Sequence, residues 1–133
     1  MVVDSSVLVA IFRREPEADT FQDIIDRASE ARLSVVSVVE TMSVLCSRRV
    51  GGTRSQVERL VAGLGLTIHG VDVAQHLHAL NALLRFGKGR HPAQLNLGDC
   101  FAYALAKSLD APLLFKGDDF ARTDIIAAWQ PAA

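Results

Sequence analysis

Short apolar segments alternate with amphipathic helical segments along this chain, and this alternation limits the possible folds more than any other feature. Strand-like runs occupy residues 1–4, 32–37, 66–71 and 111–115. Most of the sequence between them repeats apolar residues with the i, i+3, i+4, i+7 spacing of a helix. Alternating strands and helices favour an α/β fold with a mainly parallel central sheet and right-handed crossovers.

The length and composition predict one domain over residues 1–133. A chain of 133 residues, 50% of them hydrophobic, can bury a core of its own. No apolar run reaches the roughly 18 residues that span a bilayer, and Asp4 interrupts the first apolar stretch, which argues against a secretory signal. We therefore expect a cytoplasmic protein without membrane contact. The net charge of −1 lacks the basic excess of many DNA-binding domains. It leaves open a nucleic-acid enzyme that uses bound cations.

Capping residues predict where the helices begin. Ser5 or Ser6 is the expected N-cap of the first helix, and Pro16 is the expected start of the second. Ser37 and Glu40 have the form of a capping box that opens a helix ending near residue 50.

The apolar residues predict which helix faces are buried. In the helix over 73–86, one face carries Leu77, Leu80 and Leu84. In the helix over 97–110, we expect four residues to point inward: Leu97, Phe101, Ala104 and Leu105. The two cysteines, Cys46 and Cys100, form no CxxC pair, so we expect reduced core thiols rather than a zinc site.

Acidic residues stand near the ends of the expected strands or at the start of a helix. They are Asp4, Glu40, Asp99, Asp118 and Asp119. Ligands bind outside the carboxyl ends of parallel strands, so we expect four or five of these carboxylates to converge on one pocket. Simpler roles remain open, namely helix capping for Glu40, a first-turn acid for Asp99, and an ordinary turn residue for one of the last two.

Converged carboxylates predict a metal site. Their mutual repulsion raises their pKa values, and a divalent cation relieves it. Oxygen ligands without a Cys or His cluster favour Mg²⁺ or Mn²⁺. Such ions can activate a water and stabilise a pentacovalent phosphate, so the sequence predicts phosphodiester hydrolysis. The hydroxyl of Ser6 either caps its helix or orients the water or the phosphate.

This chain resembles the PIN-domain ribonucleases of the VapC toxin type in four segments: VVDSSVLVAIF, SVVSVVE, RHPAQLNLGDCFAYALAK and LLFKGDDFARTDI. The resemblance covers the whole chain. It implies a three-layer α/β/α fold and an endoribonuclease that depends on Mg²⁺ or Mn²⁺. It also implies a homodimer, a VapB-type antitoxin as partner, a heterotetramer or larger assembly with that antitoxin, and an RNA substrate such as tRNA or rRNA.

The resemblance also assigns residues by position. Asp4, Glu40 and Asp99 match the first three family acids. Both Asp118 and Asp119 precede the phenylalanine that follows the fourth acid, and we prefer Asp118. We expect Asp4 and Asp99 to bind Mg²⁺ directly. Glu40 and Asp118 would bind through water or hold a second ion.

Supporting residues follow from the same comparison. Ser6 stands where the family has Ser or Thr, and Asn96 matches an asparagine that fixes the helix start beside Asp99. Basic loop residues are expected to border the pocket and contact RNA phosphates, or else to be solvated surface charge. They are Lys88, Arg90, His91 and Lys116.

Two alternatives remain at this point. The first is a PIN fold without catalysis that serves as a binding module. The second is a phosphoacceptor receiver domain, which needs an acidic pair after the first strand. Here Asp4 is followed by two serines, which disfavours the receiver domain.

Overall fold

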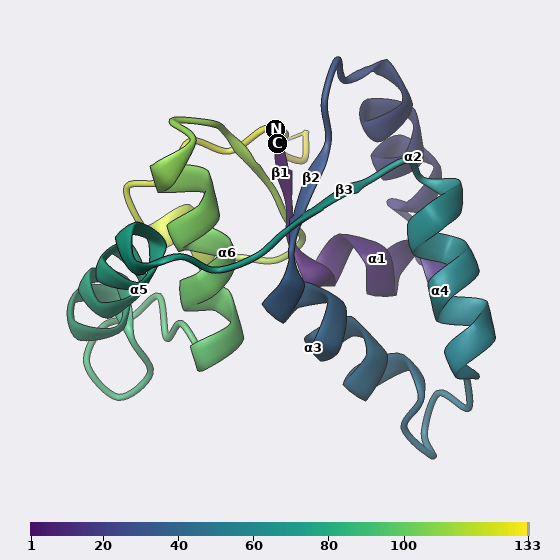
Figure 1. Cartoon of the computed structure of the whole chain (residues 1–133), viewed down its shortest axis with the longest axis horizontal. Helices are drawn as coiled ribbons and strands as arrows, with labels where there is room; N and C mark the ends of the chain where they lie inside the picture. The colour runs from purple at the N-terminus through teal and green to yellow at the C-terminus, as the bar shows by residue number, and fades with distance from the viewer. Residues whose placement is uncertain (133) are drawn as a thin grey trace.

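The computed structural model describes residues 1–132 and has a four-stranded parallel sheet with helices on both faces (Figure 1). The strand order is β3-β2-β1-β4. The strands are β1 (Val2–Val3), β2 (Arg32–Ser34), β3 (Thr67–His69) and β4 (Leu113–Leu114). The helices are α1 (Ser5–Phe12), α2 (Ala18–Arg27), α3 (Val35–Leu45), α4 (Arg54–Gly63), α5 (Val73–Phe86), α6 (Leu97–Ser108) and the short 3₁₀ helix η1 (Phe120–Arg122). The α/β prediction is confirmed.

The two valines of β1 explain the layers. Successive strand residues point to opposite faces of a sheet. Val2 packs into a core that includes residues of α5, α6 and β4, whereas Val3 packs into a core that includes residues of α1, α2 and α4. Both valines are fully buried. One strand of two residues therefore joins two hydrophobic cores, one on each side of the sheet.

The parallel pairing brings the carboxyl ends of the strands to one edge. In β1, Val2 pairs with Arg32 on one side and with Leu113 on the other. The backbone N–H of Asp4 donates to the Leu114 carbonyl at 2.9 Å, which continues the β1–β4 ladder by one bond. Asp4 is thereby fixed at the point where β1 ends and α1 begins.

Three predicted helix starts are wrong by a few residues. Asp4, not Ser5 or Ser6, caps α1, because its side chain accepts a hydrogen bond from the Ser6 N–H. Ser34 caps α3, so β2 is shorter than predicted and Ser37 lies buried inside the helix. The capping box of Ser37 and Glu40 therefore does not form. The second helix begins at residue 18, two residues after the predicted proline.

Some apolar residues face solvent rather than the core. Ala104, Leu105 and Cys100 are buried as predicted, but Leu97 and Cys46 are exposed, so their predicted burial is wrong. Phe101 is partly buried against the α6-side core. Leu97 is the first residue of α6.

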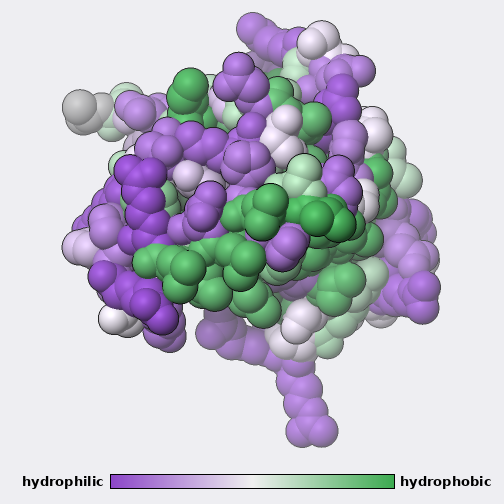
Figure 2. Space-filling model, turned by 60° about the vertical axis from the view of Figure 1, so that its left-hand side comes forward, coloured by the Kyte–Doolittle hydropathy of each residue, from purple (hydrophilic) through white to green (hydrophobic). Residues whose placement is uncertain are grey.

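The leucine face of α5 points outward. Its exposed side chains are Val73, Leu77, Leu80 and Leu84, with exposed fractions of 44–76%. Figure 2 brings this side of the molecule forward, and hydrophobic side chains gather there in a band. The opposite face of α5 buries Ala79, Ala82 and Phe86. Across residues 1–132, none of the helices is both long and apolar enough to traverse a bilayer.

Candidate active site

A cavity of about 460 Å³ lies where the carboxyl ends of the strands meet the helix starts. Its walls come from α1, α3, the start of α6, and the loop between β4 and η1. The lining residues are Asp4, Ser5, Ser6, Val9, Glu15, Glu40, Val44, Asn96, Asp99, Lys116, Gly117, Asp119 and Phe120. The predicted convergence of distant acids thus occurs for four of the five.

Asp4 is the most buried acid of this acidic cavity. Its carboxyl group is 2% exposed, and one oxygen accepts the hydrogen bond from the Ser6 N–H at 3.0 Å. Its other oxygen, Oδ1, has no hydrogen-bond partner in the described structure. Burial raises the pKa of Asp4 to about 6, the hydrogen bonds to Ser6 oppose the rise, and the charge of Glu40 adds to it. A buried carboxylate with an unpartnered oxygen is costly unless a cation compensates it.

Two residues that were not predicted to belong to the site, Ser5 and Gly98, lie against the carboxylate of Glu40. The Ser5 hydroxyl donates to Glu40 Oε1 at 2.5 Å. The carboxylate also lies so close to Gly98 that a Cβ atom there would overlap its oxygens. A side chain at position 98 would therefore force the Glu40 carboxylate out of its observed place. In the sequence, the only sign of this role is that Ser5 stands next to Asp4 and Gly98 next to Asp99 in the motifs quoted above.

Asp99 combines a capping role with its place in the cavity. Its Oδ2 accepts from the Asn96 N–H at 3.0 Å, while Asn96 Oδ1 accepts from the Asp99 N–H at 2.8 Å. This capping box fixes the first turn of α6. Burial raises the pKa of Asp99 to about 7, and the charges of Asp4, Glu40 and Asp119 add to the rise. The capping bond uses one oxygen and leaves the other for a ligand.

The two adjacent aspartates after β4 point into different cavities. Asp119 lines the acidic cavity, whereas Asp118 lines a neighbouring cavity. The structure therefore differs from the preference for Asp118. The turn at Gly117, with φ of +101°, sends the chain into η1, and Asp119 stands at the N-cap position of that helix. The sequence predicts a turn over residues 116–120 but not which aspartate it directs into the acidic cavity.

Ser6 and Lys116 connect α1 to the loop after β4. The Lys116 N–H donates to the Ser6 hydroxyl oxygen at 3.0 Å. The Lys116 ammonium pairs with Glu15 at 2.8 Å and with Glu17 at 3.2 Å. Ser6 therefore positions the loop that carries Asp119, and the charge of Lys116 is already compensated by two acids.

The other predicted RNA-binding residues lie away from this cavity. Lys88, Arg90 and His91 are not among the described residues that line it. The ring of His91 packs edge-on against Phe86 at 5.1 Å, and its Nδ1 accepts from the Ala93 N–H. His91 thus has a structural role in its loop.

The acidic cavity fits a hard divalent cation. Its donors are carboxylate, hydroxyl and amide oxygens, and the charged forms of Asp4 and Asp99 are destabilised by burial and by neighbouring acids. Within residues 1–132, no three Asp, Glu, His or Cys side chains form a ready-made cage. Mg²⁺ does not need one, because it binds one or two carboxylates directly and keeps several waters.

Comparison with known proteins places this arrangement in a family. The sequence model of the PIN-domain family matches residues 1–126, and the chain therefore belongs to this family. Within that family it belongs with the VapC ribonucleases. It is 39% identical to Ribonuclease VapC42 of Mycobacterium tuberculosis over 94% of this chain and 96% of that protein. It is 40% identical to Ribonuclease VapC of Mycolicibacterium smegmatis, with 96% and 98% covered.

Solved structures share the fold at much lower identity. The crystal structure of Mycobacterium tuberculosis VapC20, described as a toxin that cleaves the sarcin–ricin loop, superposes with a TM-score of 0.73 at 15% identity, covering 94% of this chain and 95% of that one. A chain of a toxin–antitoxin complex from Klebsiella pneumoniae gives 0.69 at 16% identity, with 96% and 95% covered. Membership of the PIN family excludes the receiver-domain alternative.

Proposed function

We propose that this VapC-type endoribonuclease, the toxin of a toxin–antitoxin pair, hydrolyses RNA phosphodiesters at the acidic cavity with Mg²⁺, for which Mn²⁺ substitutes. One observation carries the proposal. Asp4 and Asp99 come from distant parts of the chain and line the same cavity, Asp4 buried and Asp99 half-buried, and both have raised pKa values. Such a pair is stabilised by a divalent cation. We place its action in the cytoplasm, where its RNA substrates are.

Each acid has a distinct role in this proposal. Asp4 and Asp99 are the direct ligands, and Glu40 and Asp119 act through water or hold a second ion. A bound divalent ion supplies Lewis-acid stabilisation of the phosphate and lowers the pKa of water. Ser5 keeps Glu40 in place, and Asn96 keeps Asp99 in place. Water adds to phosphorus, the bond to the 3′ oxygen breaks, and that oxygen takes up a proton, leaving a 3′-hydroxyl and a 5′-phosphate.

The substrate we propose is an unpaired segment of a structured RNA such as tRNA or rRNA. Proteins recognise RNA sequence mainly in loops and bulges, whose bases are accessible. The fold neighbour described as cleaving the sarcin–ricin loop supports this class of substrate.

The experiment is cleavage of total cellular RNA with mapping of new 5′ ends. The wild type is compared with Asp99→Asn and with Asp26→Asn, a control for an exposed acid on α2 outside the cavity. We expect discrete cuts with Mg²⁺ or Mn²⁺ that disappear with EDTA and in Asp99→Asn but persist in Asp26→Asn.

Two outcomes contradict the proposal. A folded, antitoxin-free sample that makes no metal-dependent cut favours the alternative of a PIN fold that only binds. Products that end in a 2′,3′-cyclic phosphate exclude hydrolysis by water and point to attack by the ribose 2′-hydroxyl.

We also propose a VapB-type antitoxin as partner. The apolar stripes of residues 16–28 and 53–64 suggest a groove for this partner in the sequence, but Phe21, Ile25 and Val57 of α2 and α4 are buried in the core. A groove of about 660 Å³ instead lies between α3 and α4, lined in part by Val39 and Met42. Glu40 lies within α3, between Val39 and Met42, so a segment seated in the groove would end near the acids. An arginine of that partner inserted among the acids would displace metal. Unchanged Mn²⁺ affinity after partner binding would contradict direct occlusion.

The homodimer remains a proposal, and the α5 face is the surface we assign to it. Its residues Val73, Leu77, Leu80 and Leu84 follow the 4-3-4 spacing of a helix-pairing stripe. The stripe carries no charge, so two copies can face each other around a twofold axis without repulsion. Light scattering of Leu80→Glu should report monomers where the wild type gives dimers, and an unchanged mass would contradict the assignment. Larger assemblies with antitoxin would be built from that dimer.

A further inference from the structure

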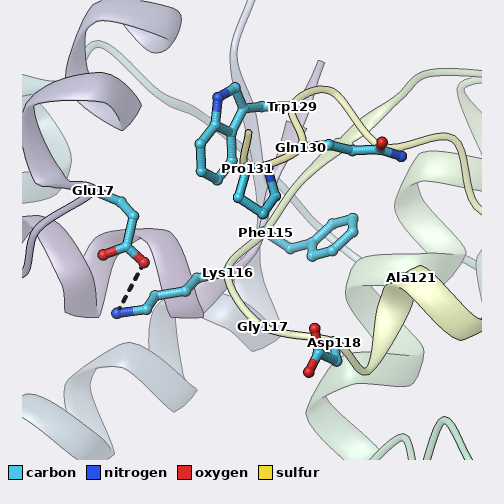
Figure 3. Close-up of a pocket in the computed structure, with 9 residues that line it drawn as sticks. All are labelled: Glu17, Phe115, Lys116, Gly117, Asp118, Ala121, Trp129, Gln130 and Pro131. Atoms are coloured by element: carbon cyan, nitrogen blue, oxygen red, sulfur yellow. Dashed lines mark ion pairs between the residues drawn. The ribbon is translucent and has the colours of Figure 1, made fainter. Parts of the chain in front are cut away.

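A second cavity, of about 590 Å³, adjoins the acidic cavity across the loop after β4 (Figure 3). We call it the aromatic cavity, because the rings of Trp129 and Phe115 line it, together with Pro131. Lys116 and Gly117 line both cavities. A nucleotide next to a phosphate held at the acids therefore has an adjoining space to enter.

Trp129 is held in place by the sheet and by the core. The segment before it adds to the edge of β4, since Leu113 exchanges backbone hydrogen bonds of 2.9 Å with Ile126 and Ala128. The indole meets the buried ring of Phe21 edge-on at 5.3 Å and 84°. The rest of the indole is half-buried at the cavity, where it meets the requirement for stacking an unpaired base.

The charges around the aromatic cavity disfavour a phosphate and favour a hydrogen-bond donor. The ammonium of Lys116 is paired with Glu15 and Glu17. The carboxylate of Asp118 is exposed and lines the cavity (Figure 3). Adenine, cytosine and guanine each present an exocyclic amino group that donates to a carboxylate. Uracil presents carbonyl oxygens on either side of its N–H, and these oppose the carboxylate.

We propose that the aromatic cavity is a base-specificity subsite, next to the scissile phosphate, for unpaired bases that carry an exocyclic amino group. Trp129 stacks a base at one end of the cavity, and Asp118 accepts a hydrogen bond from an amino group at the other end, in keeping with the places of the two side chains in Figure 3. This inference rests on the proposed RNA hydrolysis. It gives the two adjacent aspartates separate tasks, because Asp119 faces the acids and Asp118 faces the base.

The first test uses binding without cleavage. Trp129 is the single tryptophan of the chain, so its fluorescence reports directly on the subsite. In EDTA, we expect short oligo(A) and oligo(C) to quench it saturably, and oligo(U) to bind at least about fivefold more weakly. Ala121→Leu fills the cavity from an exposed position and should abolish the quenching. Ile126→Ala removes an exposed apolar side chain of the same C-terminal segment and should leave quenching unchanged.

The second test uses the cleavage pattern in the presence of Mn²⁺. Asp118→Asn introduces an amide donor, so the preference beside the cut for bases with an exocyclic amino group should relax to admit uracil. Trp129→Ala should lower kcat/KM by about 5- to 100-fold through the loss of stacking. Trp129→Phe, which keeps an aromatic ring, should recover most of that loss, whereas a purely structural defect would appear as a lowered Tm in both variants.

The outcomes separate this inference from the proposed function. Quenching in EDTA without cleavage of any RNA would overturn the nuclease and keep the subsite. Cleavage with no quenching, and with an unchanged base preference in Asp118→Asn and Ala121→Leu, would overturn the subsite alone. Variants that weaken inhibition by the antitoxin while leaving the cleavage pattern intact would show a protein-binding cavity and also overturn it.

Discussion

The acidic cavity and the aromatic cavity share two lining residues but hold their side chains in different ways. In the acidic cavity, Asp4, Glu40 and Asp99 each accept a hydrogen bond from a nearby backbone or hydroxyl group. In the aromatic cavity, Trp129 is held by ring packing and Asp118 is exposed. In the proposed roles, three of the acids that act on the phosphate are fixed by hydrogen bonds, whereas Asp118, proposed to select a base, is exposed. Breaking each kind of contact should therefore have different effects.

The largest difference is expected between the two adjacent aspartates. Asp119→Asn should lower kcat/KM by about a hundred- to thousandfold, because a carboxylate near the reacting phosphate is lost. Asp118→Asn should cost less than about tenfold and alter the base preference instead. Steady-state cleavage of one labelled RNA by both variants measures this ratio. Equal losses of kcat/KM in the two variants would contradict the separate roles proposed for the two aspartates.

The next effect concerns the space that Gly98 leaves for Glu40. Gly98→Ala should displace the carboxylate and lower activity about 10- to 100-fold, in the range found when a residue supporting a metal site is lost. Gly63→Ala in α4 is the matched control, since no atom lies within 4 Å of its Cβ position. That control should keep full activity. A fully active Gly98→Ala would mean that Glu40 is free to move.

The stability of the metal-free protein should fall as the pH rises. The pKa of Asp4 is raised to about 6 and that of Asp99 to about 7, whereas an unfolded Asp has a pKa of about 3.9. Between about pH 4 and pH 7 the folded state binds more protons, so rising pH lowers the free energy of unfolding. The stabilisation is present below pH 4 and lost by about pH 7. The two-unit shift of Asp4 corresponds to about 3 kcal/mol at most.

Chemical denaturation in EDTA across this pH range measures the slope. Asp99→Asn should flatten it, and Mn²⁺ at pH 7.5 should restore stability to the wild type only. A slope of the opposite sign would show that the acids are already compensated within the protein.

The smallest effect is expected for the hydroxyl of Ser6, which joins α1 to the loop that lines both cavities. Ser6→Ala leaves the Lys116 N–H without its acceptor and should destabilise the fold by about 1 kcal/mol. Ser55→Ala, at an exposed position of α4, is the control and should change stability by less than about 0.5 kcal/mol. Urea denaturation of the three proteins compares them. If Ser6→Ala is as stable as the wild type, the ion pairs of Lys116 with Glu15 and Glu17 hold the loop without the Ser6 hydrogen bond.

The sequence predicted the class of fold because its signals were local and periodic. The alternation of strands and helices predicted the layers, and the acids near the strand ends predicted where the candidate site lies. The prediction failed where one residue had two possible local roles. Ser34 and Ser37 both suit an N-cap, and β2 ends at the first because Arg32, Leu33 and Ser34 pair with β3.

The details of the candidate site needed three-dimensional contacts. Nothing local distinguishes Asp118 from Asp119 until the positive φ of Gly117 sets the turn. The role of Gly98 depends on Glu40, which lies 58 positions earlier in the chain. Leu97 and the leucines of α5 have the same periodicity as core residues, because a stripe for a partner chain and a stripe for the core look alike in sequence.

The central position of β1 has a consequence for the chain as it is being made. β1 is synthesised first, yet its neighbour β4 and the loop with Asp119 come near the end of the sequence. Until that last segment leaves the ribosome, the strand that carries Asp4 lacks one of its two neighbours and the acidic cavity lacks one wall. A chain stopped before β4 therefore carries Asp4, Glu40 and Asp99 but not the wall that contributes Asp119.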